Sequence, residues 1–87
     1  MVRPEGTSTI EAFAEVQTEN DFFRVTLELP GVRAEDIRVR VEDYQLTVMV
    51  EDGGFTEFEK RFKLPQKAVG IADIKFKNSI LEITQNF

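Results

Sequence analysis

The sequence contains no cysteine and no histidine among its 87 residues. Without cysteine, the fold has no disulfide and no thiolate nucleophile. Without histidine, the Ser-His and Cys-His nucleophile pairs, the usual zinc sites and any imidazole base are excluded. We therefore expect a protein that is not an enzyme and that has neither a metal site nor a cofactor.

Long apolar runs are also missing, and so is an excess of positive charge. No run approaches the roughly 18–20 residues that cross a bilayer, and the first residues contain no signal-peptide core. The 16 acidic residues outnumber the 11 basic ones, and the resulting net charge of −5 disfavours binding to phosphate backbones. We expect a cytoplasmic protein that binds neither membranes nor nucleic acids.

Apolar residues are plentiful enough for one compact core. They make up 41% of the chain, and eight of them are phenylalanine, which argues against disorder. A chain of this length builds a single domain. Residues 1–9 contain Pro4, Gly6 and several Ser and Thr residues without periodicity, so we expect a flexible lead there and the domain over residues 10–87.

Apolar and polar residues alternate along seven short segments, which is the pattern of half-buried strands. In the clearest one, Phe23, Val25 and Leu27 share a face opposite to charged and polar neighbours. No window of 11 or more residues keeps helical spacing as well. The pattern predicts an all-β protein, an antiparallel immunoglobulin-like sandwich of about seven strands. The expected strands cover residues 10–17, 23–29, 37–42, 46–51, 55–64, 74–77 and 81–84.

Turn residues separate these segments. Asp52-Gly53-Gly54 is a strong hairpin signal, because glycine accepts the positive φ of a tight turn. Asn78-Ser79 predicts a second turn, residues 33–36 predict one helical turn, and residues 66–73 predict a connector with a bend at Gly70.

Candidate catalytic and nucleic-acid-binding residues are weak. Glu57 and Glu59 share a strand face with basic neighbours, so a solvated surface is the simpler interpretation than a carboxylate pair. Arg38 and Arg40 project from another strand, but nearby acidic residues dilute any basic patch.

Three blocks in order carry a family resemblance. Residues 27–37 contain a Leu-Pro-Gly turn followed by Ala34-Glu35-Asp36-Ile37, residues 60–65 spell Lys-Arg-Phe-Lys-Leu-Pro, and residues 78–81 spell Asn-Ser-Ile-Leu. Together they resemble the small heat-shock proteins of the HSP20/α-crystallin type, over nearly the whole chain from Ile10 to Gln85. The resemblance implies an ATP-independent holdase, a chaperone that binds partly unfolded client proteins.

The resemblance also implies two binding surfaces. Extended peptides bind such domains in an edge groove, here between the third strand (Val39, Val41) and the sixth (Ile74, Phe76). An exposed sheet edge can accept an added strand. The same residues could instead simply fill the core, because alternation already demands an inward face.

The second surface is the fifth strand, through which some members dimerise. Here it carries Phe58, Lys60, Arg61 and Phe62, with lysine at the first arginine position of the family. The loop before it is short, so a dimer by strand swapping is unavailable, and the chain is expected to be a monomer or a homodimer. Ser79 also stands where the family has glycine. The short loop favours one alternative, a p23/CS-like co-chaperone or scaffold domain that docks on a folded partner.

Overall fold

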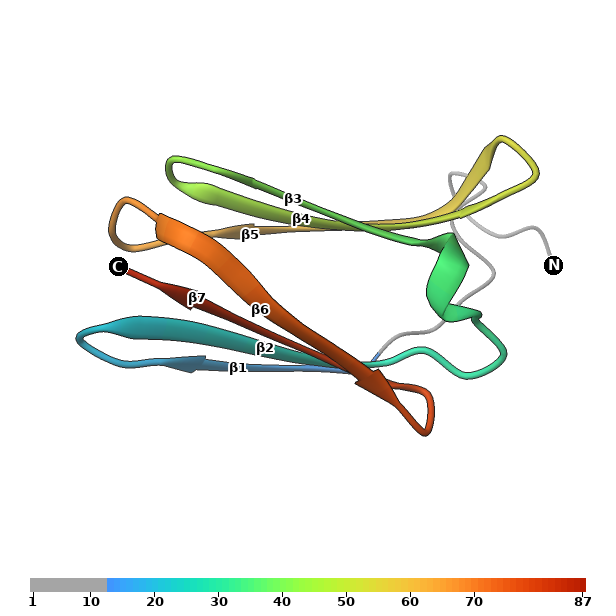
Figure 1. Ribbon diagram of the computed structural model, residues 1–87, viewed down its shortest axis with the longest axis horizontal. Helices are drawn as coiled ribbons and strands as arrows, with labels where there is room; N and C mark the ends of the chain where they lie inside the picture. The colour runs from blue at the N-terminus through green and yellow to red at the C-terminus, as the bar shows by residue number, and fades with distance from the viewer. Residues whose placement is uncertain (1–12) are drawn as a thin grey trace, which may run out of the picture.

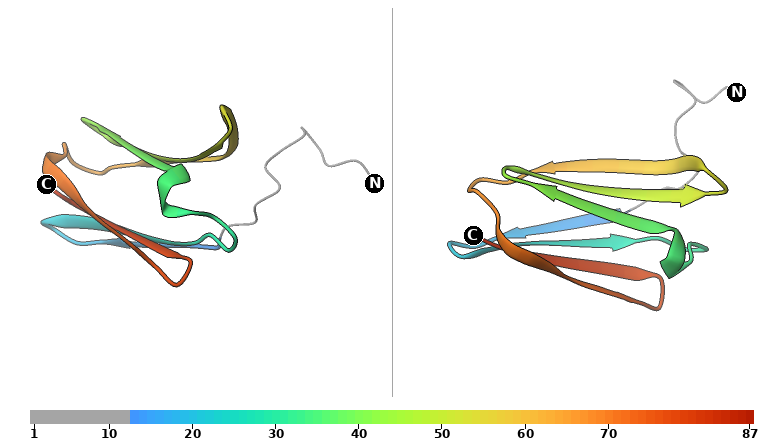
Figure 2. Two further views of the ribbon diagram at one scale, coloured as in Figure 1. Left: turned by 45° about the vertical axis from the view of Figure 1, so that its right-hand side comes forward. Right: turned by 45° about the horizontal axis from the view of Figure 1, so that its top comes forward.

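The computed structural model describes residues 13–87, which form two antiparallel β-sheets packed face to face (Figure 1, Figure 2). One sheet has the strand order β1-β2-β7-β6 and the other has the order β3-β4-β5. The all-β antiparallel sandwich expected from the sequence is confirmed. The elements are β1 (Phe13–Thr18), β2 (Phe22–Glu28), the 3₁₀ turn η2 (Ala34–Asp36), β3 (Ile37–Glu42), β4 (Gln45–Asp52), β5 (Phe55–Lys63), β6 (Val69–Lys77) and β7 (Ile80–Asn86).

The core lies between the sheets and follows from the period-two pattern. In β2, Val25 and Leu27 are fully buried, whereas the alternating Arg24 and Thr26 are only partly covered. β4 and β7, each central in its sheet, contribute in the same way, since every second side chain of a strand points to the same face. The buried apolar side chains are Phe23, Val25, Leu27, Leu29, Leu46, Val48, Val50, Phe58, Phe62, Leu64, Leu81 and Ile83.

Two hairpins close with residues in the left-handed region. Gly53 and Gly54, between β4 and β5, have φ of 59° and 88°. Asn78 and Ser79, between β6 and β7, have φ of 53° and 67°. Positive φ at both central residues is the type I′ geometry, which matches the right-handed twist of the strands. Both turns were expected from the sequence.

Replacement of Ser79 by glycine should therefore stabilise the protein. A side chain in the left-handed region costs about 1–2 kcal/mol, and the extra entropy of glycine in the unfolded chain offsets about 0.5–1 kcal/mol of the gain. We expect a net gain of about 0.5–1 kcal/mol in the free energy of unfolding, measured by urea denaturation. Asn78→Gly should gain less, because asparagine tolerates this region better. A loss of stability in Ser79→Gly would contradict the interpretation that Ser79 is strained in the left-handed region.

The sixth strand starts earlier than expected. β6 begins at Val69, whereas alternation predicted its start at Ile74 and a connector before it. The register of β6 with β7 shifts between Val69 and Asp73, and Gly70 has a φ of 75° in this bulge. A bulge inserts an extra residue and breaks the period-two pattern. Val69 therefore stands at an odd-numbered position and Ile74 at an even-numbered one, so strict alternation of apolar and polar residues does not connect them. The sequence pattern for this reason fails to predict the first half of β6.

The first strand also differs from its expected bounds. β1 spans Phe13–Thr18, and residues 10–12 of the expected strand lie outside the described residues, as does the lead over residues 1–9. Val16 shares the inner face with Ala14 but is 50% exposed. Its exposure follows from its place on an edge strand, where the facing sheet ends.

Candidate functional site

A groove of about 370 Å³ lies between the two sheets where β3 and β6 form their edges. The views in Figure 1 and Figure 2 show these two strands on the same side of the sandwich, β3 in the upper sheet and β6 in the lower. The side chains that line the groove are all aliphatic or aromatic. The lining residues are Ala34, Ile37, Val39, Ile74, Phe76 and Leu81.

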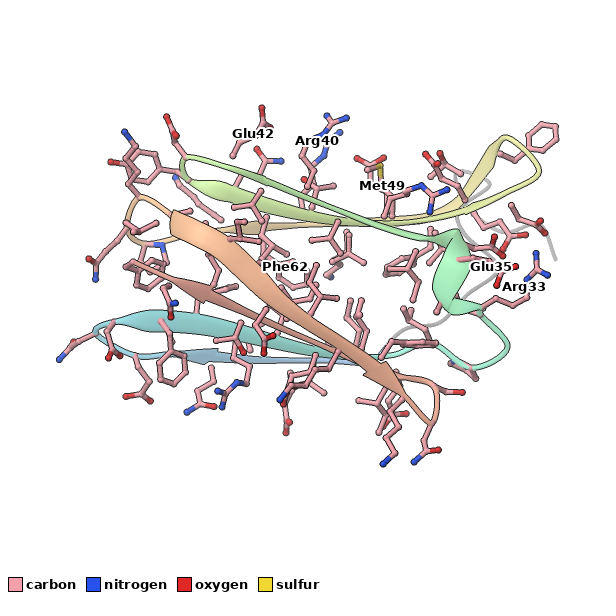
Figure 3. All side chains as sticks on the ribbon, viewed as in Figure 1. Arg33, Glu35, Arg40, Glu42, Met49 and Phe62 are labelled. Atoms are coloured by element: carbon pink, nitrogen blue, oxygen red, sulfur yellow. The ribbon has the colours of Figure 1, made fainter. Side chains whose placement is uncertain are left out.

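Alternation along β3 builds one wall. Ile37 and Val39 point inward and are half-buried, whereas the alternating Arg38 and Arg40 are exposed on the outer face. Figure 3 shows Arg40, Glu42 and Met49 pointing away from the core on this sheet, and Phe62 lying between the sheets. The outer face is thus charged while the groove face is apolar.

β6 builds the other wall by the same rule. Ile74 and Phe76 pair with Ile83 and Leu81 of the buried strand β7, which fixes them on the inner face. Because β3 ends its own sheet nearby, these side chains are incompletely covered, and Ile74 is 47% exposed. Three of the four residues predicted for the groove, Val39, Ile74 and Phe76, are thus brought together.

The groove differs from its predicted composition at one end. Val41 is half-buried and packs against the core, but it is not among the residues that line the groove. Ile37, Ala34 and Leu81 line it instead. Ile37 and Leu81 were visible in the sequence as inward positions of their strands. Ala34 joins because the 3₁₀ turn carries it across the end of the groove, which alternation does not describe.

Charged side chains hold that turn. Arg33 is 3.3 Å from Glu35 and 3.4 Å from Asp36. The hydrogen bond with Asp36, and then the charge of Glu35, raise the pKa of Arg33, so this side chain remains a cation. Arg38 of β3 donates a hydrogen bond of 2.7 Å to the carbonyl oxygen of Glu35. The end of the groove is therefore tied to the edge strand that forms its wall.

The second predicted surface lies on β5, the other edge strand of the β3-β4-β5 sheet. Phe58 and Phe62 are each 8% exposed and belong to the core of the same chain. Lys60 and Arg61 are exposed, and Arg61 makes an ion pair of 2.7 Å with Glu59. The two aromatic side chains thus anchor β5 to its own sandwich, and the charged ones face outward from its free edge.

The remaining candidates from the sequence are surface residues. Glu57 and Glu59 are exposed, and Glu59 is paired with Arg61 on the same strand. Arg38 lies 3.8 Å from Glu51, so part of its charge is locally balanced. Among residues 13–87, no group of three or more Asp or Glu side chains is placed to hold a metal ion. In the same part of the chain, no helix has the length and apolar composition needed to cross a membrane.

Comparison with known proteins identifies the family. The model of the Hsp20/alpha crystallin family matches residues 15–84. The chain belongs to this family. Small heat-shock proteins are a class of chaperones, and the resemblance carried by the three sequence blocks is confirmed.

Individual relatives agree with this assignment. The chain is 34% identical over 79 positions to "Heat shock 22 kDa protein, mitochondrial" of Pisum sativum, covering 78% of this chain and 39% of the pea protein. The match thus spans well under half of that relative, whose name places it in mitochondria. The cytoplasmic location expected for this HSP20 protein stays a prediction.

Solved structures share the fold. Heat shock protein 16.0 from Schizosaccharomyces pombe superimposes with a TM-score of 0.75 at 23% identity, covering 88% of this chain and 86% of the other. A small heat-shock protein from Xylella fastidiosa does so with a TM-score of 0.71 at 20% identity, covering 87% and 84%. At these identities the likeness is one of fold, and it agrees with the sandwich described above.

Proposed function

We propose that this HSP20 domain is an ATP-independent holdase that binds extended apolar segments of partly unfolded proteins in the groove between β3 and β6. It acts without catalysis and without a cofactor, and we place it in the cytoplasm. The observation that carries the proposal is an apolar groove flanked by two free strand edges.

The free edges supply affinity that does not depend on sequence. Within residues 13–87, β3 pairs only with β4, and β6 pairs only with β7. The opposite side of each edge strand presents backbone N–H and C=O groups that an extended peptide can pair with. A holdase needs contacts of this kind, because every unfolded client has a backbone.

The groove supplies selectivity for apolar side chains. A peptide that adds to an edge strand points every second side chain toward the inner face. Ile37 and Val39 on one side and Ile74 and Phe76 on the other would receive these side chains. Burial of apolar surface contributes roughly 25 cal/mol per Å², so segments with alternating apolar residues should bind best.

We also propose β5 as the strand through which two copies of the chain pair, with Phe58, Lys60, Arg61 and Phe62 as its central residues. Its free edge supports pairing, since nothing among the described residues covers it. Dimerisation would place two grooves in one particle, and a client with two apolar segments would then bind both with greater avidity.

One observation favours a second candidate, a p23/CS-like domain that docks on a folded partner. The β4–β5 hairpin closes with only Gly53 and Gly54 between its paired ends, so it carries no long loop. Such a domain would co-purify in stoichiometric amounts with a folded protein and would not bind unfolded chains. The groove, which is apolar rather than charged, supports the holdase.

The groove can be tested with two isoleucines of the same strand. Ile74 lines the groove, whereas Ile71 is 94% exposed and lies in the bulge of β6. Ile74→Asp places a carboxylate where an apolar client side chain would be buried, at a cost of at least about 1.4 kcal/mol, or about tenfold in affinity. We expect Ile74→Asp to weaken the binding of a fluorescent apolar peptide by at least about tenfold, and to lose suppression of client aggregation.

Ile71→Asp is the matched control, because it introduces the same charge on the same strand but away from the groove. It should bind the peptide as the wild type does. Thermal melting of both variants shows whether the fold is retained. Equal binding by Ile74→Asp and Ile71→Asp would exclude the groove as the client site.

A further inference from the structure

The two strands that border the groove carry basic side chains on their outer faces. Arg38 and Arg40 alternate with the groove residues of β3, and Lys75 and Lys77 alternate with those of β6. All four side chains are exposed. The chain as a whole has a net charge of −5. The charge beside the groove is therefore opposite in sign to that of the whole chain.

These charges are also ordered along the groove. Each edge strand carries an acidic residue at its other end, Glu42 on β3 and Asp73 on β6. Figure 1 shows that β3 begins and β6 ends on the same side of the molecule. Both strands thus place their cations toward that side and their carboxylate toward the opposite one. An extended segment bound in the groove meets a basic end and an acidic end.

The register of the β6–β7 hairpin shows which backbone groups of β6 are free. A two-residue turn closes this hairpin with Lys77 opposite Ile80. The pair that closes such a turn is hydrogen-bonded, and along antiparallel strands hydrogen-bonded pairs alternate with pairs that are not. Ile74 and Phe76 therefore direct their backbone N–H and C=O groups away from β7, toward the free edge.

The edge of β3 is partly closed by its own chain. The N–H of Ile37 donates to the carbonyl oxygen of Ala34, and the carbonyl oxygen of Ile37 accepts a hydrogen bond of 3.2 Å from Arg38. Val39 and Val41 follow along this edge, but Val41 does not line the groove. On β6, both Ile74 and Phe76 line it. A segment that pairs with β6 therefore lies along the groove, and one that pairs with β3 lies partly outside it.

The part of β6 that can pair with such a segment is short. Its bulge precedes Asp73 and its turn follows Lys77, so regular pairing extends over residues 73–77. In an antiparallel arrangement, side chains opposite Ile74 and Phe76 enter the groove. Side chains opposite Asp73, Lys75 and Lys77 lie on the outer face, next to these charges.

We propose that the groove selects segments of partly unfolded proteins in which acidic residues alternate with apolar ones, and that Lys75 and Lys77 select them. Acidic residues opposite the two lysines and a basic residue opposite Asp73 complete the pattern. From its amino end, the preferred antiparallel segment is acidic, apolar, acidic, apolar, basic. This inference rests on the client site of the proposed function and adds the chemistry of the preferred client.

These charges supply selectivity more than affinity. The side chain of Lys75 is 70% exposed, Asp73 lies 4.0 Å from it, and Glu82 faces it on β7. Exposed ion pairs contribute little in water, because two long side chains must be ordered. A segment held by its backbone is already in position, and there opposite charges on facing strands stabilise pairing while like charges destabilise it. Charge therefore separates segments of equal apolar content.

Three fluorescent peptides of equal length test the selection. Their central sequences are Glu-Ile-Glu-Ile-Lys, Lys-Ile-Lys-Ile-Glu and Gln-Ile-Gln-Ile-Gln, and both ends are blocked. By anisotropy at low salt, we expect the first to bind at least about tenfold more tightly than the second, which corresponds to about 1.4 kcal/mol. The glutamine peptide should lie between them, and added salt should reduce the difference. Long-range attraction to an acidic chain predicts the reverse order, because the second peptide is the cationic one.

Lys77→Glu and Lys67→Glu form a matched pair of variants. Both lysines are exposed and both substitutions change the net charge by the same amount, but Lys67 lies before β6, away from the groove. We expect Lys77→Glu to lose most of the preference and Lys67→Glu to keep it. Equal losses in both variants would overturn the role of Lys77. A loss in Arg40→Glu but not in Lys77→Glu would overturn the assignment to β6 and place the segment on β3.

The same measurements separate this selectivity from the client site itself. The three peptides could bind equally well to the wild type while Ile74→Asp binds none of them. That result would overturn the selection by charge and leave the groove as the client site. If the wild type bound none of the peptides, both the selection and the client site would be wrong.

Discussion

Replacement of Gln85 by glutamate should unfold much of the domain at neutral pH. Gln85 is fully buried on the inner face of β7, and its Nε2 donates to the carbonyl oxygens of Val69 at 3.0 Å, Gly70 at 3.4 Å and Asn86 at 3.0 Å. A carboxylate has no hydrogen to donate, so it would meet these oxygens as a buried charge. We expect a loss of about 4 kcal/mol or more in the free energy of unfolding.

The pH dependence distinguishes charge repulsion from lost hydrogen bonds. Burial raises the pKa of a glutamate at this position above its value of about 4.3 in the unfolded chain. Below about pH 4.3 the glutamate is protonated in both the folded and the unfolded state, so folding buries no charge. As the pH rises, the unfolded state ionises first, so the penalty grows until the pH exceeds the folded-state pKa. Gln85→Glu should therefore be closest to the wild type near pH 4, as measured by urea denaturation.

Gln85→Met is the matched control. It keeps the length of the side chain and removes the hydrogen bonds without adding a charge, so we expect a loss of about 1–3 kcal/mol that does not change with pH. Gln85→Glu and Gln85→Met could instead lose the same stability at every pH. That result would show that a charge beside these carbonyl oxygens has no cost, and it would contradict the role given to the amide.

Gln85 also shows where the period-two pattern stops being informative. It occupies an inward position of β7, after Leu81 and Ile83, where alternation expects an apolar residue. The amide lies where the bulge of β6 interrupts the regular register, and there it donates to the carbonyl oxygens of Val69 and Gly70. Neither the bulge nor its partner is encoded in local periodicity. The same bulge is the reason why alternation did not predict the first half of β6.

The regular parts of the fold and of the groove were predictable because no bulge interrupts the alternation there. Ile37 and Val39 lie in a strand with unbroken alternation, and Ile74 and Phe76 lie in the half of β6 that follows its bulge. In both places alternation fixes which face each side chain takes. The family resemblance then indicated which strands form the edges. The end of the groove was not predictable, since Ala34 enters it through a 3₁₀ turn, which the alternation of strands does not describe.

Phe76→Asp should cost the most stability among changes in the groove. Phe76 pairs with Leu81, which is fully buried, and packs against the core while it lines the groove. Aspartate there removes the ring and places a charge against apolar neighbours. We expect a loss of about 3 kcal/mol or more, and a melting temperature lower by at least about 10 °C, measured by circular dichroism.

Lys77→Asp and Phe76→Leu separate the two roles of this ring. Lys77 is the next residue of the same strand and is exposed, so aspartate there should leave the melting temperature nearly unchanged. Phe76→Leu keeps an apolar side chain in the core but shortens the wall of the groove, so it should weaken peptide binding more than it lowers stability. A melting temperature of Phe76→Asp equal to that of the wild type would place the ring wholly in the groove. The core would then end at Leu81, and β6 would be held by its ladder, by Gln85 and by the packing of Ala72.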